Sequence, residues 1–199
     1  MKVVLADHGA GNLRSVCSAL VRAGASPVVS VDADDVREAP LAVVAGVGHL
    51  ASAAYGLERN GLADALRARA AAHRPVLGIC VGMQLFFDES EEGGRGMGLL
   101  DGPVRRLHAR RVPHMGWNTL VILRSTELLD GLDGADVYFA HSYAARPNGG
   151  AAVAEVDHDG RVVAAVERGM LAGVQFHPER SGPAGARMLE NAIRWSRSA

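Results

Sequence analysis

The chain contains little cysteine, few aromatic residues and no excess of charge of either sign. Its 199 residues include 2 cysteines, 5% aromatic residues and a formal net charge of −1. Two cysteines cannot build the disulfide framework of a small secreted domain, and no zinc-type spacing of cysteine and histidine occurs. A nearly neutral chain gives no electrostatic reason to expect nucleic acid or an anionic membrane as a partner. We expect no metal and no cofactor.

Long apolar runs are also missing, so no segment reaches the length of a transmembrane helix. The N-terminus leads directly into a strand pattern, and together these features predict a cytoplasmic protein. With 48% hydrophobic residues, the length suits one compact domain, and we expect residues 1–199 to form it. A local basic cluster, which usually marks a solvated surface, consists of Arg105, Arg106, Arg110 and Arg111.

Short apolar runs alternate with helical patterns over the first half of the chain. Strands are predicted at 3–6, 27–31, 41–45 and 75–79, and helices at 13–23, at 50–72 with a break near Asn60-Gly61, and after the last strand. This alternation is typical of a mostly parallel sheet flanked by helices. Ligands bind such sheets at the carboxyl ends of the strands, where the loops 7–12, 46–49 and 80–84 are expected to meet.

Beyond residue 100 the pattern changes to short strands joined by turns. Strands are predicted at 103–108, 117–123, 136–142, 151–157, 161–167 and 171–175, and a final helix at 183–197. Because no helical pattern separates these strands, they cannot all be joined by parallel crossovers. The sequence therefore predicts an α/β fold with an antiparallel or mixed extension in its C-terminal half.

The most informative motif is Gly78-Ile79-Cys80-Val81-Gly82, between a strand pattern and a helical pattern. It is typical of a nucleophile elbow, in which flanking glycines permit a sharp turn and leave room for a substrate. The N-terminus of the following helix favours the thiolate form of Cys80. A buried core cysteine is the alternative that the motif alone leaves open. The other cysteine, Cys17, lies in a helical apolar stripe and is expected to be a core thiol.

A histidine and a carboxylate follow an apolar run in Gln175-Phe176-His177-Pro178-Glu179. Residues two apart on an extended segment point to the same side, so His177 and Glu179 are expected to project together. The imidazole would take the thiol proton of Cys80 while the carboxylate orients the ring. A surface pair at a strand end is the alternative. The elbow favours catalysis, because a thiol, an imidazole and an acid are the minimum set for thiol acyl chemistry.

The segment Ala45-Gly46-Val47-Gly48 matches no phosphate-binding motif, since neither GxGxxG nor GxxxxGK[ST] follows it. An oxyanion hole is a better interpretation, because attack on an amide creates a negative oxygen that needs preorganised N–H donors. The candidate donors are the peptide N–H groups of Val47, Gly48 and Val81. A simple turn at a strand end is the alternative.

Together these motifs resemble the class I glutamine amidotransferases. Further segments resemble one subfamily, the glutaminase subunit of imidazole glycerol phosphate synthase. They are DHGAGNL at 7–13, PHMGWN at 113–118, YFAHSY at 138–143 and QFHPERS at 175–181. The resemblance covers essentially the whole chain in matching order, and PHMGWN is its most specific element. It implies a single glutamine amidotransferase type 1 domain with a flavodoxin-like parallel core.

The resemblance implies that Cys80 attacks the carboxamide of glutamine, that His177 transfers the proton and that Glu179 orients His177. Water then hydrolyses the glutamyl thioester to glutamate. The positions that hold glutamine are matched by Gly48, Gln84, Ser142 and Tyr143.

The resemblance also implies a partner, a barrel-shaped synthase subunit that forms a heterodimer with the glutaminase. Ammonia passes to that subunit, which makes imidazole glycerol phosphate and aminoimidazole carboxamide ribotide in histidine biosynthesis. The face that docks on the partner is matched by Asn12, Met115, Trp117, Tyr138 and Arg180.

Three positions depart from the family pattern. Ala45 replaces a proline, which restores an N–H and frees φ, so we expect a loop that flips more easily and higher uncoupled glutamine hydrolysis. His8 replaces a tyrosine, and we expect altered packing behind the loop. Arg180 replaces a lysine, keeping the charge but changing the geometry of any ion pair.

Other functions remain open at this point. One alternative is an amidotransferase of pyridoxal phosphate, anthranilate or guanylate synthesis. The segments PHMGWN and the opening DxGxGN disfavour it. A cysteine hydrolase that acts alone is disfavoured by the HPE spacing. A non-catalytic regulatory domain is expected to lack one of Cys80, His177 and Glu179, and all three are present.

Overall fold

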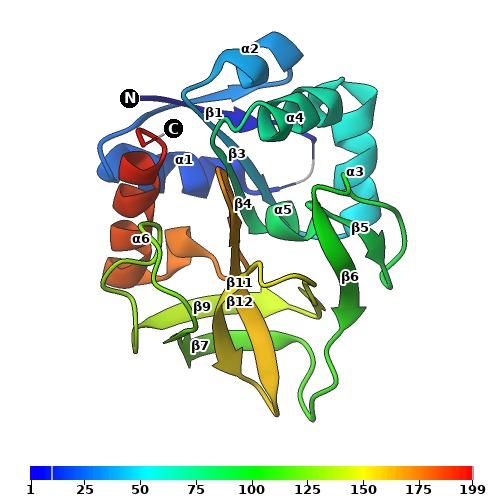
Figure 1. Cartoon of the computed structure of the whole chain (residues 1–199), viewed down its shortest axis with the longest axis vertical. Coiled ribbons are helices and arrows are strands. Elements are labelled where there is room, and N and C mark those ends of the chain that lie inside the picture. Colours follow the sequence, from blue (N-terminus) through cyan, green and yellow to red (C-terminus); the bar gives the residue numbers. More distant parts are fainter. Residues whose placement is uncertain (10, 199) are drawn as a thin grey trace.

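The structure, a computed structural model, describes residues 1–9 and 11–198, and Figure 1 shows how their elements are arranged. The strands are β1 (Lys2–Ala6), β2 (Ser26–Ser30), β3 (Leu41–Gly46), β4 (Val76–Cys80), β5 (Phe87–Ser90), β6 (Leu100–Arg106), β7 (His114–Thr119), β8 (Val121–Ile122), β9 (Asp136–His141), β10 (Tyr143–Ala145), β11 (Ala152–Asp157), β12 (Arg161–Arg168) and β13 (Leu171–Val174). The helices are α1 (Leu13–Arg22), α2 (Ala33–Glu38), α3 (Leu50–Arg59), α4 (Leu62–Ala71), α5 (Val81–Gln84) and α6 (Gly182–Trp195), with a 3-10 turn η1 (Pro178–Arg180).

An eight-stranded sheet in the order β2-β1-β3-β4-β13-β12-β11-β8 forms the centre of the molecule. The strands from β2 to β13 in this order are parallel, and β12, β11 and β8 continue the sheet antiparallel. Strands β3 and β4 are buried along their whole length, as expected for parallel strands covered on both faces. The predicted α/β fold with a mixed C-terminal extension is therefore confirmed.

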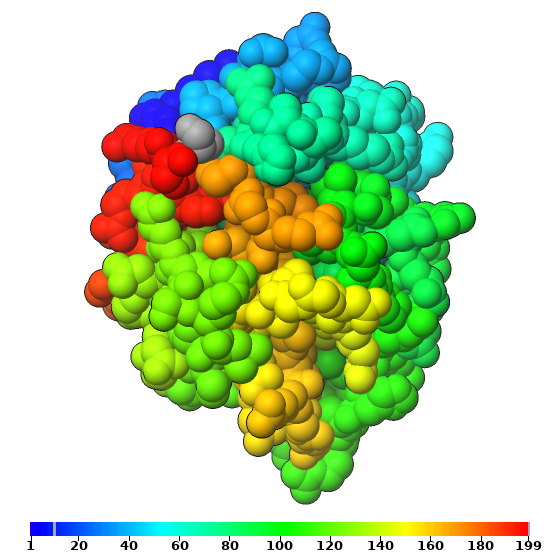
Figure 2. Space-filling view, in the orientation of Figure 1, coloured from blue at the N-terminus to red at the C-terminus, as the bar shows by residue number. Residues whose placement is uncertain are grey.

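Helices cover both faces of the parallel strands (Figure 1). Helix α1 contacts α6 on one side, while α4 contacts both α2 and α3 on the other. Figure 2 shows the C-terminal helix in red beside the blue N-terminal segments, so the two ends of the chain pack together. In the final helix Leu189 and Ile193 are buried, as predicted for its inner face.

Three local predictions need correction or addition. The apolar pattern after the elbow does not form a helix through residue 87: α5 ends at Gln84, and Phe87 begins the strand β5, which pairs with β6. Helix α2 was not predicted, because its six residues carry mostly polar side chains. Its N-terminus is defined by Asp32, whose side chain accepts a hydrogen bond from the N–H of Asp34 at 2.8 Å. The short strand β10 was not predicted either.

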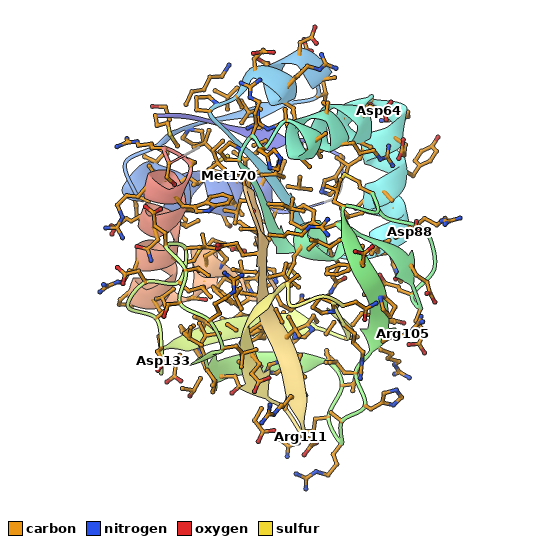
Figure 3. All side chains as sticks on the ribbon, in the orientation of Figure 1. Asp64, Asp88, Arg105, Arg111, Asp133 and Met170 are labelled. Atoms are coloured by element: carbon orange, nitrogen blue, oxygen red, sulfur yellow. The ribbon has the colours of Figure 1, made fainter. Side chains whose placement is uncertain are left out.

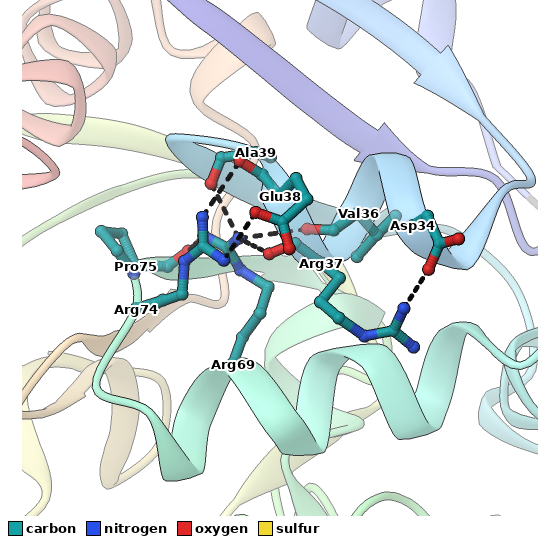
Figure 4. Close-up of polar contacts among 8 residues, drawn as sticks. All are labelled: Asp34, Val36, Arg37, Glu38, Ala39, Arg69, Arg74 and Pro75. Atoms are coloured by element: carbon teal, nitrogen blue, oxygen red, sulfur yellow. Dashed lines mark hydrogen bonds and ion pairs between the residues drawn. The ribbon is translucent and has the colours of Figure 1, made fainter.

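A buried arginine fastens the amino ends of the central strands (Figure 4). Arg69 of α4 is 1% exposed, and its guanidinium donates to the carbonyl oxygens of Val36, Arg37 and Ala39 at 3.1, 2.9 and 2.7 Å. It also donates to the carbonyl of Pro75 at 2.7 Å. Burial, and then the charge of nearby Arg74, lowers the pKa of Arg69 to about 10, which still leaves it charged at neutral pH. We call this group the Arg69 clamp.

The predicted basic cluster is not one continuous surface. Arg105 pairs with Glu89 at 2.6 Å, and Arg110 pairs with Asp159 at 2.7 Å. Figure 3 shows Arg105 beside β6 and Arg111 at the far tip of the antiparallel extension. Within the described ranges, no helix is long and apolar enough to cross a membrane.

Candidate active site

Cys80 lies at the carboxyl end of β4 in a sharp turn. Its backbone has φ 54° and ψ −111°, a region that residues other than glycine rarely adopt. A side chain at Gly82 would collide with the carbonyl of Val44, and a Cβ at Gly78 would come within 2.7 Å of the backbone of Met83. The glycines therefore permit the close packing that the turn requires, which is the geometry of an elbow. Helix α5 is a single turn, so its electrostatic support for a thiolate is smaller than a full helix would give.

His177 and Glu179 form a buried pair beside this cysteine. The Nδ1 atom of His177 lies 2.9 Å from Oε1 of Glu179, and their side chains are 6% and 7% exposed. Burial disfavours a charged ring, but hydrogen bonds with Cys80 and Glu179 outweigh burial and raise the pKa of His177 to about 10. The predicted convergence is present. The predicted extended segment is wrong, because Glu179 lies in the 3-10 turn η1, which begins directly after His177.

The backbone of His177 is held by strand β9. Its N–H donates to the carbonyl of Tyr138 at 2.8 Å, and its carbonyl accepts from the hydroxyl of Ser181 at 2.7 Å. The N–H of Tyr138 in turn donates to that hydroxyl at 3.0 Å. This reciprocal pattern fixes the catalytic histidine candidate relative to β9.

A cavity of about 480 Å³ opens beside the sulfur. Its lining brings together all the residues predicted for the oxyanion hole and for glutamine binding, which are Val47, Gly48, Val81, Gln84, Ser142 and Tyr143. Gly48 has φ +90°, so this position strongly favours glycine. Two of the three loops predicted to meet at the carboxyl edge of the sheet, 46–49 and 80–84, contribute to this pocket, whereas the described residues of the loop 7–12 are not part of its lining. Ala10 of the first loop lies outside the described residues.

Two charged residues also line the cavity, Glu92, which the sequence did not single out, and Arg106, which it indicated only as part of a basic cluster. Glu92 accepts a hydrogen bond from the N–H of Leu50 at 2.8 Å and lies 3.2 Å from Nδ1 of His49. Neither residue belongs to a recognisable motif. Each comes from a loop or strand whose position beside the elbow depends on tertiary structure. In the part of the chain that is described, no group of three or more His, Cys, Asp or Glu side chains is arranged to hold a metal ion.

His8 lies behind the candidate oxyanion loop. Its ring is 4% exposed, and Nε2 is 2.9 Å from the carbonyl oxygen of Ala45. Burial lowers the pKa of His8, against the opposing effects of this hydrogen bond and of Asp7. A Cβ at Gly46 would come within 3.1 Å of the His8 ring. The histidine thus packs directly against the loop.

Three of the candidate docking residues, Met115, Trp117 and Tyr138, lie on the β7-β9 ribbon, while Arg180 belongs to η1 and Asn12 precedes α1. Trp117 pairs with Tyr138 across the strands, and their rings meet edge to face at 6.0 Å. The guanidinium of Arg180 lies 5.6 Å from the centre of the Tyr138 ring. Met115 and Trp117 are 66% and 58% exposed. Asn12 lies at the N-terminus of α1, where its side chain accepts a hydrogen bond at 3.4 Å from the N–H three residues later.

The fold and this site define a class of enzyme, the class-I glutamine amidotransferases. The family model of that description matches residues 4–195. A solved structure described as a glutamine amidotransferase has a TM-score of 0.80 and 19% identity, covering 98% of both chains. PurLQS from Thermotoga maritima has a TM-score of 0.74 and 18% identity, also covering 98% of both chains. At such low identities these structures share the fold alone.

Relatives of higher identity define the subfamily. The imidazole glycerol phosphate synthase subunit HisH of Carboxydothermus hydrogenoformans is 44% identical over 192 residues, covering 94% of this chain and 96% of the relative. The proteins of the same name from Xylella fastidiosa and Mycolicibacterium paratuberculosis are each 46% identical, with 96% of both chains covered. The chain therefore belongs to the HisH subunits, and the predicted subfamily is confirmed.

Proposed function

We propose that this chain hydrolyses glutamine to glutamate and ammonia at the cavity beside Cys80 and supplies the ammonia to a synthase subunit. The observation that carries the proposal is the hydrogen bond between Cys80, which lines the cavity, and His177, whose ring is paired with the buried carboxylate of Glu179. A thiol beside an oriented imidazole is the arrangement that nucleophilic attack on an amide requires. Membership of the HisH subunits supports the same reaction.

The first half of the reaction forms a thioester. The sulfur of Cys80, having given its proton to His177, attacks the carboxamide carbon of glutamine. The carbonyl oxygen becomes an oxyanion, and its proposed donors are the N–H groups of Val47, Gly48 and Val81, residues that line the cavity. His177 then donates the proton to the departing nitrogen, so the C–N bond breaks and ammonia leaves.

The second half restores the enzyme. His177, now neutral, takes a proton from a water molecule that attacks the thioester carbon. The C–S bond breaks, glutamate leaves, and the sulfur recovers its initial state. Glu179 holds the ring through Nδ1 during both transfers. One of its oxygens, Oε2, is buried and has no hydrogen-bond partner among the residues described. The imidazolium is therefore the principal counter-charge of this carboxylate.

The polar end of glutamine is expected to bind away from the sulfur. Glu92 supplies a carboxylate for the α-ammonium group, and Arg106 supplies a guanidinium for the α-carboxylate, both from the lining of the cavity. Ser142 and Tyr143 border the same space. This assignment follows from charge complementarity between these side chains and the two charged groups of the amino acid.

The partner is proposed to be the barrel-shaped cyclase subunit of imidazole glycerol phosphate synthase, bound in a heterodimer. The exposed residues Met115 and Trp117, with Tyr138 and Arg180, make an aromatic and cationic surface of the kind that is enriched at interfaces. We further propose that residues 1–199 form a single amidotransferase domain, which the family match over 4–195 supports, and that the chain is cytoplasmic.

The test compares two nitrogen sources in the complex with the synthase subunit. Cys80→Ala is expected to abolish glutamine-dependent synthesis while ammonia-dependent synthesis continues, because free ammonia does not need the thiol. Cys17→Ala is the matched control and should retain both activities. Glutamine-dependent turnover by Cys80→Ala would refute the nucleophile assignment.

A further inference from the structure

A second buried glutamine contacts the nucleophile. Gln175 follows β13 and is 0% exposed. Its Nε2 atom lies 3.5 Å from Sγ of Cys80, and its Oε1 accepts a hydrogen bond from Nε2 of Gln84 at 2.9 Å. The reaction steps described above give this side chain no role, although it touches the reacting sulfur atom.

The surrounding groups determine which end of the Gln175 amide faces the sulfur. Nε2 of Gln84 also donates to the carbonyl oxygen of Tyr143 at 2.8 Å. A carbonyl oxygen only accepts hydrogen bonds, so the nitrogen of Gln84 must lie on that side. Its second N–H then requires an acceptor from Gln175, which places the Gln175 oxygen towards Gln84. The Gln175 nitrogen consequently faces Cys80, with an N–H directed at the sulfur.

We propose that Gln175 is a second side-chain hydrogen-bond donor to the Cys80 sulfur and stabilises its thiolate form. The proposal rests on the function assigned above to Cys80. His177 is the first donor, but it gives its proton to the leaving ammonia during the reaction. An amide does not ionise under these conditions, so Gln175 keeps its N–H throughout the cycle. A hydrogen bond to a charged acceptor is about twice as strong as one between neutral groups.

The same network defines what Gln84 offers to the substrate. Both N–H groups of its amide are used, one by Tyr143 and one by Gln175. Only Oε1 remains, and this atom accepts hydrogen bonds. Gln84 therefore recognises an N–H group of glutamine, and the side chain that contacts the substrate is linked through Gln175 to the sulfur that attacks it.

The test measures how the reactivity of Cys80 depends on pH in the complex with the synthase subunit. Iodoacetamide alkylates the thiolate, and mass spectrometry of the Cys80 peptide separates this reaction from any at Cys17. Gln175→Leu removes the donor and is expected to raise the pH midpoint of alkylation by about one to two units, the range that corresponds to one hydrogen bond to a charged group. The turnover number for glutamine should fall with it.

Gln175→Glu separates the effect of the hydrogen-bond donor from the effect of the size and shape of the side chain. This nearly isosteric variant keeps an acceptor for Gln84 but places a carboxylate against the sulfur. It is expected to raise the midpoint further than Gln175→Leu does, because a like charge disfavours the thiolate. The KM for glutamine should change little, because Gln84 keeps its partner. Co-purification with the synthase subunit and a cooperative unfolding transition report that both variants are folded and bound to the partner.

The outcomes separate the alternatives. Midpoints and turnover numbers equal to those of the unmodified protein, in variants that fold and co-purify with the synthase subunit, would overturn the role of Gln175. A purely structural role would lower the unfolding temperature without moving the midpoint, which would also overturn the proposal. If Gln175→Glu does not fold, Gln175→Leu alone decides. Glutamine turnover by Cys80→Ala would instead refute the function assigned to Cys80 and, with it, this inference.

Discussion

The two ends of the central strands both contain buried polar groups, but they differ in what those groups bind. At the amino ends, the Arg69 clamp donates to four backbone carbonyls before β3 and β4. At the carboxyl ends of β4 and β13, side chains bind other side chains, in the order Gln84, Gln175 and Cys80. The Arg69 network therefore binds only main-chain oxygens, whereas the Gln84–Gln175 network reaches the sulfur of Cys80 beside a cavity.

This difference shows how the same sheet serves stability and chemistry. The two terminal nitrogens of the Arg69 guanidinium donate to main-chain oxygens, and its buried Nε has no hydrogen-bond partner among the described residues, so the Arg69 clamp acts on the geometry of the fold. The carboxyl ends instead carry backbone strain beside a cavity. Cys80 has a positive φ of 54°, and Oε2 of Glu179 has no hydrogen-bond partner among the described residues. Mutations at the two ends should therefore affect different measurements.

The largest expected effect is at the carboxyl end. His177→Asn should reduce glutamine-dependent turnover by about 10²–10⁴-fold, the usual contribution of a general acid and base. Steady-state kinetics in the complex measures this change. Ammonia-dependent synthesis serves as the control and should stay within a factor of about two, since it bypasses proton transfer. Equal losses with both nitrogen sources would assign His177 a structural role.

The next effect is at the amino end and appears in stability. Arg69→Met should lower the free energy of unfolding by about 3 kcal/mol, because buried carbonyl oxygens lose their donor. Arg67→Met on the same helix is the matched control. Its partners Glu58 and Asp64 are exposed, so about 1 kcal/mol or less is expected. Urea unfolding measures both variants. A loss of glutamine turnover in folded Arg69→Met would break the division between the two ends.

Much of this organisation was predictable from local sequence. Alternating apolar runs and turn residues indicated β1 to β4 and the break at Asn60-Gly61, where Gly61 adopts φ 68°. Glycines around Cys80 indicated the elbow, because tight turns demand specific residue types. A helix after the elbow was predicted and is present, but its early end at Gln84 was not, since an apolar stretch of five residues fits either a helix or a strand, and pairing of β5 with β6 favoured a strand from Phe87.

Tertiary contacts account for the rest. In the sequence, nothing distinguishes Arg69 from other charged residues of a helix. Only the fold brings its side chain to the carbonyl oxygens of Val36 and Arg37, more than thirty positions away. Gln175 was present in a motif already noted, but its contact with Cys80 spans 95 positions in the chain. Glu92 joins the cavity in the same way. No periodicity or spacing rule records which side chains meet across such distances.

A third prediction concerns a set of buried histidines beside the cavity. His141 Nδ1 donates to the carbonyl of Tyr143 at 2.8 Å, and its Nε2 accepts from Nδ1 of His114 at 3.0 Å. Burial lowers the pKa of His141 to about 3 and, with the effect of His158, lowers that of His114 to about 4. Both rings are therefore neutral in the folded protein at pH 7.

These folded-state pKa values lie below the ordinary value of 6.5, so the unfolded chain binds more protons as the pH falls. Stability should decline between about pH 6.5 and 4. His114→Phe should show a shallower decline in urea unfolding across this window. An unchanged slope in His114→Phe would contradict neutral burial of this ring.

The smallest effect is expected at Ala45, behind the oxyanion loop. Ala45→Pro restricts φ but keeps the carbonyl that His8 contacts. Glutamine hydrolysis by the isolated chain should fall by about two- to fivefold, the factor that corresponds to a backbone preference of 0.4–1 kcal/mol. Binding of the synthase subunit should reduce the difference. An unchanged rate in the isolated chain would remove Ala45 as a cause of uncoupled hydrolysis.

The assignment of Cys80 as nucleophile is tested most directly by trapping the acyl-enzyme. The complex is mixed with glutamine, quenched in acid during turnover and digested, and the peptides are identified by mass spectrometry. A glutamyl adduct confined to the Cys80 peptide, absent in Cys80→Ala and enriched when hydrolysis is slowed, is the predicted result. An adduct on Cys17, or turnover without any adduct on Cys80 under conditions that preserve thioesters, would contradict it.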